Sequence, residues 1–184
     1  PDYKPFILEI PDNWSWAESY NVPLDVLESI VDTAIMRGYS VAWATDISED
    51  GFDFLKRGMA MAPAIIYASD SMREVTRWKK KTHDEKENCI FSLDDPVEEL
   101  NVTPELRQLA YETYTTTDDH GMLLLGLATD RNGRKFYYVK NSWGTDNPYK
   151  GYMYVSTPYF RYKTISIMLN KEALTSEIRS LLNI

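Results

Sequence analysis

The side chains best suited to chemistry in this sequence are those of His120 and Asn141. A histidine that acts as a base needs its second ring nitrogen held by an acceptor, which fixes the tautomer and stabilises the imidazolium. Asn141 can supply that acceptor. An amide suits a thiol nucleophile, because thiolate and imidazolium already form an ion pair and need no third charge. If the strand continues to Trp143, its indole falls on the same face and can shield the bond from water, which strengthens it.

Other reactive side chains fit other chemistries poorly. His83 lies in a charged run, and with Asp84 and Cys89 it gives too few ligands at any recognised spacing for a metal site. Cys89 is the only cysteine, so no intrachain disulfide can form. Ser142 lacks the Gly-x-Ser-x-Gly elbow that exposes a serine nucleophile. We therefore expect neither a metal nor an organic cofactor.

Two helices are predicted in the part of the chain before His120. Apolar residues recur at three and four positions from Pro23 to Gly38, which predicts an amphipathic helix, and residues 39–44 follow as a strand. Thr103, followed by proline and glutamate, is a helix start, and that helix should run to about residue 114. It delivers the chain to His120.

The last third of the sequence changes to the period of strands. The predicted strands form an antiparallel sheet and cover residues 122–128, 135–140, 151–155 and 164–169. Residues 130–133 form a hairpin turn, because Asn and Gly tolerate the positive φ that such turns require. A hairpin folded about residues 131 and 132 brings positions near 121 and 141 opposite each other, within side-chain reach.

The remaining segments carry weaker signals. Residues 6–13 read as an extended segment, residues 46–63 as loop with short helical pieces, and residues 72–88 as a solvated helix or linker. Residues 170–182 are predicted as a terminal helix.

Composition limits the classes of function. A chain of 184 residues with 43% hydrophobic and 13% aromatic residues should fold as one compact unit. The net charge of -8 argues against nucleic acid as a partner. No apolar run is long enough to span a bilayer, and the first four residues lack the layout of a signal peptide. The sequence leaves open whether the compartment is cytoplasmic or periplasmic.

An ordered pair of motifs resembles a known family. Asp119-His120-Gly121 leads into an apolar strand and a hairpin, and Lys140-Asn141-Ser142-Trp143-Gly144 follows, with Gly151-Tyr152 after it. This order resembles the second half of papain-like cysteine peptidases, and within them the bleomycin hydrolase and aminopeptidase C branch. The resemblance extends to residues 21–24, the helix after them and the strand with Trp43, and it is weakest over residues 50–100.

The resemblance implies a role for each matched residue. His120 would be the base that pairs with the thiolate, Asn141 its orienting amide, and Trp143 the shield over that bond. The implied fold is the papain-like α+β type, with residues 1–184 as a single C-terminal, sheet-rich lobe with packed helices. The implied partners are a peptide substrate and the other lobe of the same protein, and the branch also contains ring-shaped hexamers, so a homo-oligomer stays open.

Two features depart from the family's pattern. The family's nucleophilic cysteine lies at a helix start well upstream of the histidine, with a glutamine before it, and nothing here matches that segment. Cys89 has no glycine beside it and no tryptophan after it, so we interpret it as structural. The chain begins without Met, and we expect the nucleophile in an upstream segment, which leaves this chain alone inactive.

The second departure concerns the end of the chain. The branch often ends in an extended arm that restricts cleavage to amino termini, whereas residues 170–182 read as helix. An alternative to the peptidase is a degenerate homologue that binds peptides or acts as a scaffold.

Overall fold

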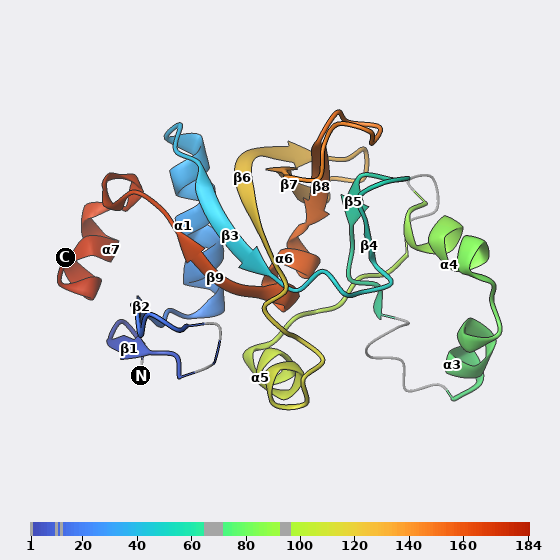
Figure 1. The fold of residues 1–184 in the computed structure, drawn as a ribbon, viewed down its shortest axis with the longest axis horizontal. Helices are drawn as coiled ribbons and strands as arrows, with labels where there is room; N and C mark the ends of the chain where they lie inside the picture. The colour runs from blue at the N-terminus through green and yellow to red at the C-terminus, as the bar shows by residue number, and fades with distance from the viewer. Residues whose placement is uncertain (1, 10, 12, 65–71, 93–96) are drawn as a thin grey trace.

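One curled sheet organises the chain, with helices packed against it (Figure 1). The computed structural model describes residues 2–9, 11, 13–64, 72–92 and 97–184. In the order in which they lie across the sheet, its strands are β4 (Phe52–Asp53), β5 (Met59–Ala60), β8 (Tyr152–Ser156), β7 (Lys135–Lys140), β6 (His120–Thr129), β3 (Val41–Thr45) and β9 (Thr164–Met168). Neighbouring strands are antiparallel except β5 and β8, which are parallel. A separate pair, β1 (Pro5–Ile7) and β2 (Glu18–Tyr20), is also antiparallel.

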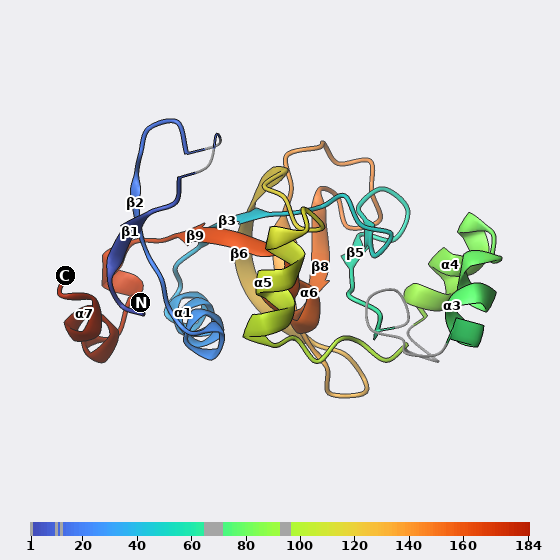
Figure 2. The ribbon, with the colours of Figure 1, turned by 90° about the horizontal axis from the view of Figure 1, so that it is seen from below.

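Helices cover the sheet and extend beyond both of its ends. Helix α1 packs against β3 and β6, and α6 packs against β7, β8 and β9. Figures 1 and 2 show α3 and α4 at one end of the molecule and α7 with the β1–β2 pair at the other. The helices are α1 (Leu24–Met36), α3 (Met72–Lys79), α4 (His83–Ile90), α5 (Pro104–Glu112), α6 (Thr157–Lys163) and α7 (Ser176–Leu182), with a 3₁₀ turn η1 (Lys171–Ala173). None of the described helices is long and apolar enough to cross a membrane.

The main core lies between α1 and the central strands. Val31 and Ala34 of α1 are fully buried against apolar side chains of the sheet, among them Val41, Leu124 and Val139. This explains the helical spacing of the apolar residues in α1 and the alternation in β3, because each element has one buried face. The core therefore fixes β3, β6 and β7 relative to one another, and these are the strands that lead to His120 and Asn141.

The hairpin between β6 and β7 confirms the predicted turn. Thr129 pairs with Lys135, so residues 130–134 form the connection. Asp130 Oδ1 accepts from the backbone N–H groups of Asn132 and Arg134, both at 2.9 Å, and Gly133 takes a φ of 79°. The register shifts by one residue between Leu124 and Gly126. On the side of this shift away from the turn, Leu123 lies opposite Lys140.

The predicted elements of the sheet and its helices are confirmed with small shifts in their ends. These are the helix after Pro23, the strand before Asp46, the helix capped by Thr103 and the four strands of the last third. The charged run forms α3 and α4, two short helices. The extended segment near the N-terminus holds β1, although Ile10 and Asp12 lie outside the described residues.

Two predictions were wrong in detail. Residues 46–63 hold no helical piece and instead carry β4 and β5, whose short pairings reach β8. Residues 170–182 do not form one helix, because η1 ends before Leu174 and α7 starts anew. Thr175 caps that start, its side chain accepting from the N–H of Ile178.

Candidate active site

His120 is the first residue of β6, and its imidazole contacts the amide of Asn141. The two residues come from neighbouring strands, since Asn141 directly follows β7. Nε2 of His120 lies 2.7 Å from Oδ1 of Asn141. The backbone of His120 pairs with Thr45 on β3, so the ring is held at a sheet position rather than in a loop. The structure thus brings together the two residues that the sequence singled out.

A second hydrogen bond sets the orientation of the Asn141 amide. Oδ1 also accepts from the backbone N–H of Ser142, at 2.7 Å. An N–H can only donate, so the oxygen of the amide must face both Ser142 and the imidazole. Nε2 of His120 therefore carries the hydrogen, and Nδ1 is left to accept a proton. This is the tautomer that a general base needs.

The loop between β7 and β8 is braced around Asn147. Its Oδ1 accepts from the N–H of Gly151 at 2.6 Å, and its Nδ2 donates to the carbonyl of Tyr152 at 2.6 Å. The N–H of Asn141 donates to the carbonyl of Gly151 at 3.0 Å, which closes the loop at its base. Asn141 is 5% exposed and Asn147 is 7% exposed. These bonds hold the backbone of Asn141 at the base of the loop.

Trp143 lies beside the imidazole at the start of that loop. The centroids of the Trp143 and His120 rings are 4.9 Å apart, with a tilt of 43°. Edge contacts with Phe52 at 6.0 Å and Phe54 at 5.7 Å support the indole. Trp143 remains 46% exposed, so it covers one side of the site only. Neither phenylalanine was predicted from the sequence, because the strand β4 covers only Phe52 and Asp53 and is too short to show a period.

Tyr159 packs against Phe52 and so supports the aromatic group around Trp143. Its ring lies 6.3 Å from that of Phe52, and its hydroxyl donates to the carbonyl of Asp46 at 2.9 Å. Burial raises the pKa of Tyr159 well above 10.0, and the nearby carboxylates of Glu49 and Asp46 raise it further. The hydroxyl therefore stays protonated and acts as a fixed donor.

Asp119 precedes His120 but its carboxylate turns away from the ring. Oδ1 accepts from the hydroxyl of Thr117 at 2.7 Å, and Oδ2 accepts from the N–H of Ile47 at 3.4 Å. Asp119 therefore holds the approach to β6, and Asn141 is the acceptor for the imidazole.

The other candidate residues lie apart from this site. Cys89 belongs to α4 and packs, partly buried, against a second apolar cluster that includes Trp78 and Phe136. Both ribbon views place α4 beyond β4 and β5, at the far side of the sheet from β6 (Figures 1 and 2). Nε2 of His83 lies 2.6 Å from Oε1 of Glu87 on the same helix. No group of three or more His, Cys, Asp or Glu in the described ranges could hold a metal ion.

Comparison with known proteins decides the family. The sequence model of the Peptidase C1-like family matches residues 74–184, which include His120, Asn141 and Trp143. This chain belongs to that family. The match confirms the resemblance to the papain-like cysteine peptidases.

Two curated relatives share shorter stretches with the chain. Aminopeptidase W of Lactobacillus delbrueckii subsp. lactis is 35% identical over 63 residues, which are 34% of this chain and 14% of that protein. Cathepsin L1 of Drosophila melanogaster is 49% identical over 35 residues, 19% of this chain and 9% of that protein. The matched stretches are thus small parts of these relatives.

A solved structure supports the fold over the whole chain. PepW from Lactobacillus rhamnosis HN001 superposes with a TM-score of 0.63 and 16% identity, covering 100% of this chain and 35% of that one. The chain therefore has the papain-like α+β fold and spans about a third of the length of this structural relative.

Proposed function

We propose that this chain supplies the general base of a cysteine-type peptidase, with His120 as the base, Asn141 as its orienting amide and Trp143 as a shield over their bond. The observation that carries the proposal is the 2.7 Å contact between Nε2 of His120 and Oδ1 of Asn141. The acceptor is neutral, which fits a thiolate partner that brings its own negative charge. Membership of the Peptidase C1-like family points the same way.

The reaction follows from the tautomer at His120. Nδ1 takes the proton of a thiol, and the thiolate attacks the carbonyl carbon of the peptide bond to form a tetrahedral intermediate. The imidazolium then gives its proton to the leaving amine as the acyl-enzyme forms. In the second half, Nδ1 takes a proton from water and the water oxygen attacks the acyl carbon. The C–S bond then breaks to release the carboxylic acid, and the imidazolium returns its proton to the sulfur, which restores the thiol. Asn141 holds the ring plane through both halves.

The nucleophile is proposed to come from a segment outside residues 1–184, on the other lobe of the same protein. Cys89 is unsuited, because it packs in the second apolar cluster on α4. This chain by itself is expected to be inactive, since base and orienting amide cannot replace the thiol. A homo-oligomer remains compatible with this arrangement.

Aminopeptidase action is the finer part of the proposal. It rests on the similarity to Aminopeptidase W and to the fold of PepW. The test uses the full-length protein with two peptides of one sequence, one with a free amino terminus and one acetylated. An aminopeptidase hydrolyses only the first, whereas hydrolysis of both peptides would refute that mode and leave the cysteine peptidase standing.

The role of His120 is tested in the same assay. His120→Ala should lower kcat by about 10²–10⁴-fold, because proton transfer is lost at both steps. His83→Ala is the matched control, since it removes the chain's other histidine, which pairs with Glu87 on α4. If the wild-type protein folds but hydrolyses neither peptide, the degenerate, peptide-binding homologue becomes the better description.

A further inference from the structure

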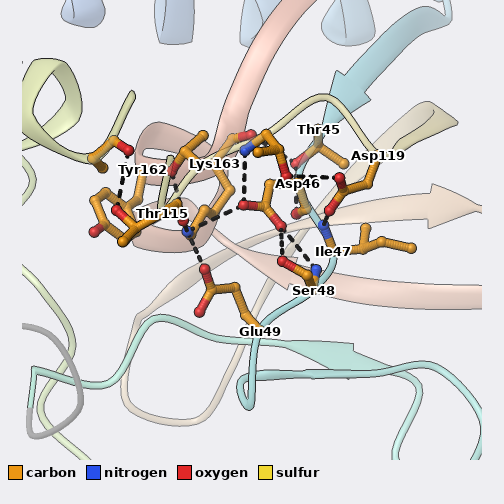
Figure 3. Close-up of polar contacts among 12 residues, drawn as sticks. Thr45, Asp46, Ile47, Ser48, Glu49, Thr115, Asp119, Tyr162 and Lys163 are labelled. Carbon is orange, nitrogen blue, oxygen red and sulfur yellow. Dashed lines mark hydrogen bonds and ion pairs between the residues drawn. The ribbon is translucent and has the colours of Figure 1, made fainter. Parts of the chain in front are cut away.

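A cluster of polar and charged groups joins Lys163 to residues 46–49 and 115–119 (Figure 3). Lys163, the last residue of α6, and Asp46, the first residue after β3, are both 0% exposed. Among the ion pairs of the described residues, theirs is the one in which both side chains are at most 1% exposed. Burying two charges is costly unless several hydrogen bonds compensate, and an apolar pair of similar volume is often as stable. The pair therefore calls for an explanation beyond stability.

The ammonium group of Lys163 joins two segments that are far apart in the sequence. Nζ donates to the carbonyl of Thr115 at 2.6 Å and to the hydroxyl of Thr116 at 3.1 Å. It also lies 3.4 Å from Oδ2 of Asp46 and forms an ion pair with Glu49. Lys163 thus ties residues 115–116 to residues 46–49.

The carboxylate of Asp46 joins the same two segments from the other side. Oδ1 accepts from the N–H of Ser48 at 2.8 Å and from its hydroxyl at 2.7 Å. Oδ2 accepts from the N–H of Thr117 at 3.1 Å. The carboxylate therefore fixes the turn after β3 and the segment that enters β6.

Both clamped segments, residues 46–49 and residues 115–117, are adjacent to residues that hold the backbone of His120. Thr45 pairs with His120 across β3 and β6, and the N–H of Asp119 donates to the carbonyl of Thr45 at 3.3 Å. The hydroxyl of Thr117 donates to the carboxylate of Asp119, and the N–H of Thr117 donates to that of Asp46. Only Asp118 and Asp119 separate Thr117 from His120. A shift of the clamped segments must therefore move the start of β6.

We propose that Lys163 and Asp46 are positioning residues that set the place of His120 relative to Asn141. The inference rests on the proposed function, because it assigns the buried ion pair to the geometry of that base. The hydrogen bonds of the two side chains described above go to residues 48 and 115–117. They act through the backbone of residues 115–119, while Asn141 is held separately by its own loop around Asn147.

The test measures kcat and KM of the full-length protein in two variants. Lys163→Met keeps most of the side-chain volume and removes the ammonium group. Asp46→Asn keeps the shape and the acceptor for Ser48, and it removes the charge and the oxygen that accepts from the N–H of Thr117. Since a misplacement of about 1 Å can cost about 10²-fold in rate, we expect kcat to fall roughly 10- to 100-fold in Lys163→Met, with KM unchanged. Asp46→Asn should lower kcat in the same way by a smaller factor.

The matched control is Arg37→Met. Arg37 is also a cation that donates to backbone carbonyls, those of Ala173 and Leu174, each at 3.0 Å. These contacts join the end of α1 to the C-terminal segment and do not touch residues 115–120. Arg37→Met should lower the stability without changing kcat, which separates positioning from a general loss of stability.

A second readout does not depend on activity. In protein labelled with ¹⁵N-histidine, the hydrogen-bonded Nε2–H of His120 gives a signal that is assigned by its absence in His120→Ala. The signal should persist in Arg37→Met, and in Lys163→Met it should move or be lost by exchange with water. If the wild-type protein shows this signal without peptidase activity, the function fails while the signal of the variants still decides the positioning role.

Two results together would overturn the positioning role of Lys163 and Asp46. Folded Lys163→Met and Asp46→Asn proteins with the kcat and the His120 signal of the Arg37→Met control would show that the ion pair does not position the base. If Lys163→Met fails to fold, the isosteric Asp46→Asn variant decides by the same two readouts.

Discussion

The orientation of the His120 ring depends on one hydrogen bond with a fixed direction, from Nε2 to Oδ1 of Asn141. The N–H of Ser142 and the imidazole both meet Oδ1 of Asn141, so the amide cannot be reversed without setting two N–H groups against each other. The sequence predicted this pair from residue types and strand ends. It placed them within side-chain reach across the hairpin, but it could not predict the register shift between Leu124 and Gly126.

Removing the amide should separate orientation from binding. In the full-length protein, Asn141→Ala leaves the imidazole of His120 without its acceptor, so the ring can rotate and take the wrong tautomer. We expect kcat to fall by about 10- to 100-fold, with little change in KM. Asn132→Ala, at the exposed hairpin turn, is the control and should leave kcat unchanged. A loss seen equally in both variants would contradict the orienting role.

Replacing the indole should have a smaller effect. Trp143→Leu removes the ring beside His120 and its edge contacts with Phe52 and Phe54. Aromatic contacts of this kind are worth about 0.5–1.5 kcal/mol, so we expect kcat to fall roughly 2- to 10-fold. Trp14→Leu, at an 84% exposed position, is the control. A Trp143→Leu protein with wild-type kcat would remove Trp143 from the site.

At the scale of the element, long periodic segments were predictable and short ones were not. α1 and β6 have enough residues for a period to appear, and Asp130 and Gly133 mark the hairpin between β6 and β7. The two-residue strands β4 and β5 have no period of their own, since their place is set by pairing with β8. The residues that support Trp143 were therefore missed together with these strands.

Burial of Lys163 was also beyond sequence reasoning. Lysine is almost never fully buried unless it is paired, and nothing near Lys163 in the sequence predicts its partners. Asp46 and Thr115 meet it only because α6 and β9 return to the end of β3. Long-range packing decided this feature, and local pattern carried no signal of it.

The loop between β7 and β8 yields a prediction at this scale. Asn147→Ala removes a buried hydrogen bond to Gly151 and a partly buried one to Tyr152. Leaving buried backbone groups unpaired costs about 1–3 kcal/mol, so the free energy of unfolding should fall by about that amount in urea titrations. The loop holds Asn141 at its base, so kcat should fall as well. Wild-type stability in Asn147→Ala would contradict the proposed brace.

At the scale of the whole molecule, the charged groups predict how stability depends on pH. Burial raises the pKa of Asp46, but hydrogen bonds from Ser48 and the ammonium group of Lys163 outweigh it, so the pKa lies below 3.8. For Glu28 burial also raises the pKa, and bonds from Lys135 and Arg161 bring it below 4.5. A lowered pKa in the folded state adds stability above the unfolded pKa, and that stability is lost as pH falls.

We therefore expect the free energy of unfolding to fall as pH drops below about 4, as the unfolded chain binds more protons. Glu99 acts in the opposite sense, since burial raises its pKa above 4.5. Urea titrations followed by tryptophan fluorescence at pH 6 and pH 3.5 measure the difference. In Asp46→Asn the decline should be shallower, because one group with a lowered pKa is gone. An equal or steeper decline in Asp46→Asn would refute a lowered pKa of Asp46 in the folded protein.

The most direct test of the central claim treats the full-length protein with an irreversible thiol-directed epoxide, followed by intact mass and peptide mapping. We predict one adduct per chain, on a cysteine outside residues 1–184. In the control His83→Ala this adduct should form at the wild-type rate. In His120→Ala the adduct should form about 10²–10⁴-fold more slowly, because the thiol is no longer deprotonated by its base. An adduct on Cys89, or one that forms as fast without His120, would contradict the claim.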